Sequence, residues 1–168
     1  DAQVVFVGPC SAKKLEASRK SVRSDVDFVL TFEELMGMFV AKNVDFNHLK
    51  EKPLENKTSA DGRGFAVAGG VAQAVVNAAK QLNPNIEIKV ASAQGLENCK
   101  KMLKDAKAGK YDGYLLEGMA CPLGCASGAG TITMATKTRA MVELSKREAV
   151  KKHSPESEYV ERLHDLME

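Results

Sequence analysis

The chain has 168 residues, of which 44% are hydrophobic and 27% are charged, as in an ordinary globular domain. Its 24 basic and 22 acidic residues leave a net charge of +2, so charge gives no reason to expect nucleic acid as a partner. The apolar runs are too short to span a membrane, and no signal peptide is recognisable. The four cysteines do not suggest a disulfide scaffold in a chain this long. We therefore expect a reducing, cytoplasmic location, with neither nucleic acid nor a membrane as partner.

The first segment of the chain alternates between strand and helix patterns. Residues 4–7 and 27–30 are short apolar runs that predict buried strands. Thr31 and Glu34 have the spacing of a capping box, which predicts a helix that begins here and ends near Lys42. Its buried face should contain Leu35, Met38 and Phe39.

A polar loop and a second helix are predicted next. Residues 50–64 are polar and contain Pro53, Gly62 and Gly64, which favours a loop. Gly69 and Gly70 open a helix that ends at residues 83–85. One face of this helix should contain Val71, Val75, Ala78 and Leu82.

The remaining elements continue the alternation. Residues 86–91 predict a strand, residues 96–106 a helix, and residues 113–116 a strand that ends at Glu117. The apolar stripe of that helix should be Leu96, Cys99, Leu103 and Ala106. The chain should be helical again from about Thr136, with a break at residues 153–155. There Ser154 would cap a final helix that has Pro155 at its first position.

This alternation predicts an α/β fold with a mainly parallel sheet flanked by helices, followed by C-terminal helices. We expect residues 1–135 to form the α/β core and residues 136–168 the C-terminal helices. The chain begins with Asp1 rather than Met, and a strand pattern follows almost at once. We therefore expect a partial domain, a fragment that begins inside a larger domain.

Two cysteine motifs are the most informative feature of the sequence. Cys10 follows the first strand, and Cys121 and Cys125 follow the last one, each with Pro and Gly alongside. The carboxyl ends of parallel strands are where α/β folds collect ligands, so the two loops can converge on one site. Pro and Gly disfavour a regular helix there and let the backbone approach a bulky group closely. Three thiolates from two such loops favour an iron–sulfur site over three buried small hydrophobes.

Several residues near the motifs have competing interpretations. Cys99 lies on a helical apolar stripe, so core packing is the better interpretation for it. Lys13 and Lys14 both follow Cys10 closely; one of them is expected to face water, and a lysine here can instead donate a charge-assisted hydrogen bond to an anionic ligand or thiolate. Glu16 can pair with that lysine or face water. Glu117 can orient another group, relay protons, or simply end a strand.

Other titratable residues are less informative. The three histidines, His48, His153 and His164, lie in polar contexts away from the cysteine loops, so metal ligation by them is not favoured. A group of basic residues lies near the C-terminus: Lys146, Arg147, Lys151 and Lys152. It can be a solvated helix face or a docking surface for an acidic electron-transfer partner.

At these motifs the sequence resembles the C-terminal part of the catalytic, large-subunit domain of iron-only (FeFe) hydrogenases. The resemblance covers nearly the whole chain and rests on the Pro-Cys-x-x-Lys-x-x-Glu motif at residues 9–16 and the Met-Ala-Cys-Pro-x-Gly-Cys motif at residues 119–125. Residues 29–35, 69–71 and 95–98 extend it. The two cysteine motifs are specific only as a pair.

The resemblance implies an oxidoreductase that reversibly reduces protons to hydrogen. Cys10, Cys121 and Cys125 would be three of the four ligands of a 4Fe–4S cubane, and the Cys125 sulfur would bridge to a diiron subsite that carries carbon monoxide, cyanide and a bridging dithiolate. Lys13 would hydrogen-bond a cyanide ligand, Glu16 would support Lys13, and Met119 would pack near the diiron subsite. The implied partners are the missing N-terminal part of the same domain, a ferredoxin-like electron carrier and hydrogenase maturation factors.

The sequence also departs from the family pattern. The motif that supplies the fourth cubane ligand and the proton-relay cysteine is absent, and so are the accessory ferredoxin-like clusters, so we expect the chain alone to be inactive. Prototypical members have Met at the position of Gly8 and Gly at the position of Leu123. These changes leave room for a hydrogen- or redox-sensing protein. An iron–sulfur assembly factor and an α/β domain without metal are further alternatives.

Overall fold

The computed structural model describes residues 2–22, 25–52, 57–158 and 160. Its strands are β1 (Val5–Val7), β2 (Phe28–Leu30), β3 (Lys89–Gln94) and β4 (Tyr114–Met119). Its helices are α1 (Ala12–Ser18), α2 (Phe32–Ala41), α3 (Ala60–Arg63), α4 (Gly70–Leu82), α5 (Leu96–Lys107) and α6 (Ala135–Glu148). Short 3-10 turns lie at Lys20–Val22, Phe46–His48, Gly64–Ala66, Cys125–Ser127 and Ser154–Glu156.

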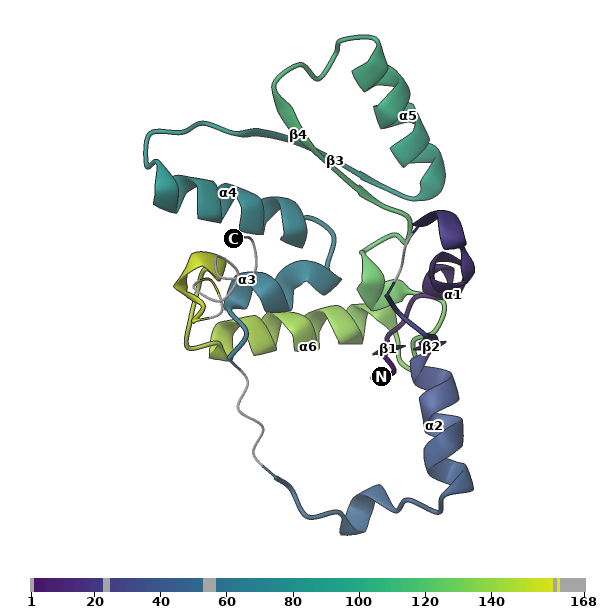
Figure 1. Ribbon diagram of the computed structural model, residues 1–168. Coiled ribbons are helices and arrows are strands. Elements are labelled where there is room, and N and C mark those ends of the chain that lie inside the picture. Colours follow the sequence, from purple (N-terminus) through teal and green to yellow (C-terminus); the bar gives the residue numbers. More distant parts are fainter. Residues whose placement is uncertain (1, 23–24, 53–56, 159, 161–168) are drawn as a thin grey trace.

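The fold is α/β with parallel pairing, as the sequence predicts, but the strands form two separate two-stranded sheets. β1 pairs with β2 in the register Val5 to Phe28, and β3 pairs with β4 in the register Lys89 to Tyr114. Parallel neighbours need a crossover, and α1 and α5 each lie between the two strands of one pair. Figure 1 shows α3, α4 and α6 grouped together, with the β3–α5–β4 unit on one side of them and the β1–α1–β2 unit at the end of α6.

Local signals place several elements correctly. Thr31 caps α2 through the expected capping box: its hydroxyl accepts a hydrogen bond from the Glu34 amide, and the Glu34 carboxylate accepts one from the Thr31 amide at 2.9 Å. The helix start at Gly70 and the helix over 96–106 are also confirmed. The expected loop over 50–64 is wrong at α3, because the Ser59 hydroxyl accepts from the Gly62 amide and begins a helical turn.

Two expected boundaries differ from the structure. β3 begins at Lys89 rather than at Ile86, because the Ile86 amide closes a turn onto the Asn83 carbonyl at 3.0 Å. The break after α6 holds a 3-10 turn, Ser154–Glu156, whose N-cap is His153 rather than Ser154. The expected final helix, and His164 with it, lies outside the described residues. The division at residue 135 stays a prediction.

The predicted apolar faces are only partly covered. Of the three residues expected to be buried on α2, Met38 is exposed, whereas Leu35 and Phe39 are half-buried. On α4 the buried residues are Ala72 and Ala74, whereas Leu82, on the predicted apolar face, is 85% exposed. On α5 the buried residue is Met102, whereas Leu96 and Leu103 of the predicted stripe are both exposed.

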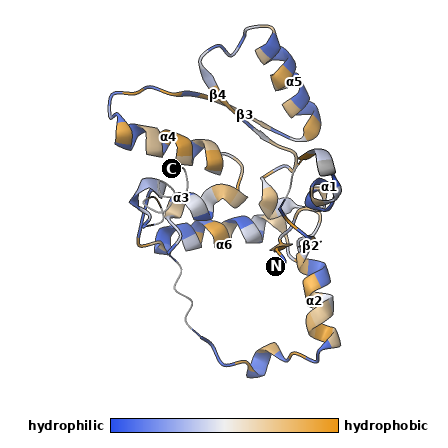
Figure 2. Ribbon diagram, viewed as in Figure 1, coloured by the Kyte–Doolittle hydropathy of each residue, from blue (hydrophilic) through white to orange (hydrophobic). Residues whose placement is uncertain are grey.

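The core is thin for a chain of this size. Its buried apolar residues are Val67, Ala72, Ala74, Met102, Ala126 and Ala149. The accessible surface is 12817 Å², compared with roughly 8,100 Å² expected for a compact monomer of this mass. Figure 2 shows hydrophobic segments along α2, which projects away from the other helices. Many large apolar side chains therefore stay partly exposed within the described part of the chain.

Candidate cluster-binding site

The first cysteine loop continues directly from β1. The Gly8 amide donates to the Leu30 carbonyl at 3.0 Å, which extends the β1–β2 pairing by one residue, and half-buried Cys10 follows. A Cβ atom on Gly8 would lie 2.6 Å from the ring of Phe6. The Phe6 ring therefore occupies the space that a larger side chain at residue 8 would need.

Lys13 and Glu16 form an ion pair on α1, just after Cys10. The Lys13 ammonium donates to both carboxylate oxygens of Glu16 at 2.8 Å. This hydrogen bond raises the pKa of Lys13, and negative charge on Glu16, Cys10 and Cys125 acts in the same direction against a smaller loss of hydration. Lys13 is therefore a persistent cation within electrostatic reach of two of the predicted ligands.

The Lys14 side chain, next along the chain, contacts β2 and the start of α2 rather than Glu16. Its ammonium donates to the Glu34 carboxylate at 2.7 Å and to the Val29 carbonyl at 3.3 Å. Chiefly because of this lysine, with help from Thr31, the pKa of Glu34 falls to about 2. Lys14 thus joins α1 to the start of α2, and Lys13 is the one of the two lysines that faces the cysteines.

The second cysteine loop is a tight turn after β4. The Gly124 amide donates to the Cys121 carbonyl at 3.0 Å, so residues 121–124 form a β-turn with Pro122 and Leu123 at its centre. A Cβ atom on Gly124, whose φ is +90°, would lie 2.5 Å from the Ala68 amide nitrogen. Only glycine lets the turn pack this closely against the segment before α4.

The two cysteine loops are in direct contact. The Gly130 amide donates to the Pro9 carbonyl at 2.9 Å, and a Cβ atom on Gly128 would overlap the same carbonyl oxygen. Partial desolvation raises the pKa of the Cys125 thiol, and negative charge on Cys10 and Cys121 raises it further, while Lys13 opposes the rise. Cys10, Cys121 and Lys13 therefore lie within electrostatic reach of Cys125.

Glu117 has an orienting role in this arrangement. Its buried carboxylate accepts hydrogen bonds from the backbone amides of Gly69 at 2.5 Å and Ala72 at 3.0 Å. These amides begin α4, whose N-cap, Gly69, has no side chain to serve them. Glu117 thus ties β4, from which the second cysteine loop leaves, to the first turn of α4.

Met119 and Cys99 meet where β4 ends, with the Cys99 sulfur 3.6 Å from the Met119 carbonyl oxygen. Met119 is the last residue of β4 and is half-buried, and its carbonyl accepts from the Gly95 amide at 2.8 Å. Half-buried Cys99 packs from α5 against Gly118, with its sulfur 3.5 Å from the Ala93 carbonyl oxygen. This placement agrees with a packing role for Cys99.

The described histidines are engaged elsewhere. His48 pairs with Asp45 at 2.6 Å, and His153 pairs with Asp61 at 3.0 Å. The basic group named above lies on and after α6. One of its members, Lys146, forms an ion pair with Glu143 at 3.1 Å.

The donor set fits a cluster better than a single ion. Within the described ranges, no three His, Cys, Asp or Glu side chains lie close enough to hold one metal ion. A 4Fe–4S cluster makes a different demand, because its thiolates bind different irons and stand farther apart. The site offers three thiols on two touching loops, a glycine that keeps one loop close-packed, and a nearby cation. The ligand roles themselves stay predictions.

Comparison with known proteins identifies the family. Residues 1–129 match the family described as "Iron only hydrogenase large subunit, C-terminal domain", and the chain belongs to this family. The periplasmic Fe hydrogenase large subunit of Nitratidesulfovibrio vulgaris is 30% identical over an alignment of 187 positions, which covers 87% of this chain and 44% of the relative. Protein NAR1 of Arabidopsis thaliana is 31% identical over 174 residues, which cover 76% of this chain and 37% of the relative.

Solved structures support the fold. Variants of the FeFe-hydrogenase HydA1 from Chlamydomonas reinhardtii superpose with a TM-score of 0.71 at 21% identity, over 97% of this chain and 58% of theirs. The chain spans less than half the length of these curated relatives and somewhat more than half of the solved chains. Among the described residues, no helix has both the length and the apolar character needed to cross a bilayer.

Proposed function

We propose that this chain is the cluster-binding part of an iron-only hydrogenase, an oxidoreductase that interconverts protons and hydrogen. Cys10, Cys121 and Cys125 hold a 4Fe–4S cubane, and in the complete protein a diiron subsite with carbon monoxide, cyanide and a bridging dithiolate lies beside it. The bound group supplies the redox chemistry of hydrogen. The protein residues bind it and set the charge around it.

The Lys13–Glu16 pair is the observation that carries this proposal. Glu16 holds the lysine ammonium by two 2.8 Å contacts, and Lys13 lies within electrostatic reach of Cys10 and Cys125. A hydrogen-bond donor with a permanent positive charge suits an anionic ligand next to the cubane. A protein that held only the cubane would have no evident need for this lysine.

The same geometry argues that the 168-residue chain alone is inactive. A cubane normally takes four thiolates, and the chain places three in the two loops. Cys99 packs against Gly118 and the β3 backbone rather than joining them. We expect the remaining ligand, a ferredoxin-like electron donor and maturation factors to come from outside these residues, in the cytoplasm. Hydrogen turnover by this chain alone would refute the expectation.

An iron–sulfur assembly role is the second candidate. It is favoured by the similarity to protein NAR1 and to the cytosolic iron-sulfur assembly component 3 of Mus musculus, which is 27% identical over 76% of this chain and 35% of that relative. A sensory hydrogenase is favoured by the residues that depart from the prototypical pattern next to the cysteines, Gly8 and Leu123.

One experiment separates the three candidates. The full-length protein that carries this sequence is produced anaerobically with maturation factors, and its infrared spectrum in the carbon monoxide and cyanide region is measured together with hydrogen turnover. Bands with fast turnover support the enzyme, and bands with little turnover support a sensor. Bound iron without bands supports the assembly role. Lys13→Met should weaken or remove the bands, whereas the matched variant Lys14→Met, which changes the neighbouring lysine, should keep them.

A further inference from the structure

The turn between the two cysteines has an unusual residue at its third position. Leu123 has φ +69°, in the left-handed region that β-turns with Pro at the second position normally give to glycine. Only one other non-glycine residue in the described chain, Asn43, has a positive φ, and asparagine tolerates it well. Leucine does not, so some other contact must oppose the tendency of this turn to relax.

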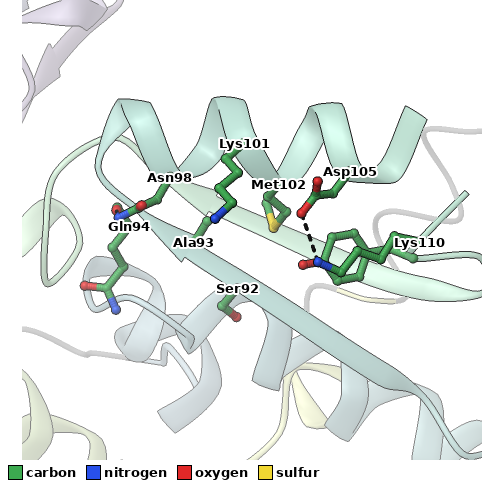
Figure 3. Close-up of a pocket in the computed structure, with 9 residues that line it drawn as sticks. Ser92, Ala93, Gln94, Asn98, Lys101, Met102, Asp105 and Lys110 are labelled. Atoms are coloured by element: carbon green, nitrogen blue, oxygen red, sulfur yellow. Dashed lines mark hydrogen bonds and ion pairs between the residues drawn. The ribbon is translucent and has the colours of Figure 1, made fainter. Parts of the chain in front are cut away.

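Gln94 supplies that contact. It is the last residue of β3, and its side-chain carbonyl oxygen accepts a hydrogen bond from the Leu123 amide at 2.8 Å. Its own backbone carbonyl accepts from the Asn98 side chain at 2.8 Å, which fixes the end of β3 against α5. Figure 3 shows the Gln94 side chain directed away from α5, although the residue also lines a surface pocket between α5 and β3.

The turn is therefore held from two sides. The Leu123 amide donates to Gln94, and the Leu123 carbonyl accepts from the Ala68 amide at 3.2 Å. Leu123 lies between Cys121 and Cys125, so any rotation of its backbone moves the two thiols relative to each other. The backbone contact to Ala68 does not depend on side-chain identity, whereas the contact to Gln94 does.

We propose that Gln94 is a positioning residue that holds Leu123 in its left-handed conformation and thereby sets the spacing of the Cys121 and Cys125 thiols. Part of this proposal, the effect on a bound cluster, rests on the proposed function. The effect on the turn itself does not, and it is measurable in protein without metal.

The first test measures hydrogen exchange of the Leu123 amide in the metal-free full-length protein. Gln94→Met keeps the length of the side chain but removes the acceptor, and it should accelerate exchange at Leu123 about 5-fold, the factor for one neutral hydrogen bond. Gln94→Glu keeps an acceptor oxygen and should restore protection. Gln3→Met is the matched control on an exposed glutamine that belongs neither to β3 nor to the turn, and it should change nothing at Leu123. Unchanged exchange in Gln94→Met would overturn the proposal.

The second test uses the cluster as the readout. Iron content and the reduction potential of the reconstituted cluster are compared for Gln94→Met in the native background and in a Leu123→Gly background. Gly adopts the left-handed conformation freely, so the Gln94→Met change should alter the potential and the iron content less in that background. Equal changes in both backgrounds would show that Gln94 does not act through Leu123 and would overturn the proposal. Failure to bind any cluster, with the exchange result intact, would refute the proposed function alone.

Discussion

Removal of the Glu117 carboxylate should be the most destabilising single change at this site that leaves the cysteines in place. Its two oxygens accept from the Gly69 and Ala72 amides, and the side chain is only 8% exposed. A hydrogen bond to a charged group contributes about 1.5–3 kcal/mol, and the two share one carboxylate, so they are not additive. In Glu117→Ala the Gly69 and Ala72 amides at the start of α4 would also have no acceptor. We expect the free energy of unfolding to fall by about 3 kcal/mol.

The assay is urea unfolding of metal-free protein followed by circular dichroism, with thermal unfolding as a second measurement. For a chain of this length the loss corresponds to a fall in Tm of about 6–12 °C. The control is Glu97→Ala, because Glu97 is also an acidic residue in the first turn of a helix, α5, but is exposed. It should cost no more than about 0.5 kcal/mol. If Glu117→Ala costs as little as Glu97→Ala, the capping argument is wrong.

Three further changes test other parts of the site. Gly130→Ala would place a Cβ atom 2.6 Å from the Thr31 Cβ. The change should destabilise the protein by about 1–3 kcal/mol in the same urea assay. An unchanged midpoint of urea unfolding would contradict the close contact between Gly130 and Thr31. Lys13→Met removes the charge that lowers the pKa of the Cys125 thiol, so in metal-free protein the pH at which Cys125 is half-maximally alkylated should rise, and an unchanged pH profile would place the lysine elsewhere. Because the pKa of Glu34 is depressed to about 2, its stabilising contribution is present above its ordinary value of 4.5 and is lost as pH falls towards 2. Glu34→Gln should therefore be less stable than the native protein at pH 6 but not at pH 2, and a difference that persists at pH 2 would refute this.

Features that depend on nearby residues could be predicted from the sequence. The capping box of Thr31 and Glu34 spans four residues and carries its own hydrogen-bonding logic. The contact between the two cysteine loops was predictable because both loops follow the carboxyl ends of strands, where parallel α/β folds collect ligands. The family match confirms the resemblance that the cysteine motifs indicate. The Lys13–Glu16 pair was predictable because the two residues are three apart, a spacing that places side chains next to each other on a helix.

Features that depend on distant partners could not be predicted from the sequence. Glu117 is one carboxylate at the end of a strand, and nothing near it in sequence says that it will cap a helix that begins 47 residues earlier, at Gly70. The burial of the apolar faces of α4 and α5 could not be predicted, because periodicity finds an apolar side, whereas burial needs a neighbour on that side. Gln94 gave no signal at all, because its role depends on the backbone angle of Leu123.

The contact between the two cysteine loops has a consequence for folding. Cys10 and Cys121 are separated by more than a hundred residues and belong to different βαβ units. A cluster bound to both would act as a covalent crosslink between the units, and closing a loop of this length removes conformational entropy from the unfolded chain worth about 4–5 kcal/mol in the simplest chain model. In a chain with so thin a core, cluster occupancy and resistance to proteolysis should therefore rise and fall together.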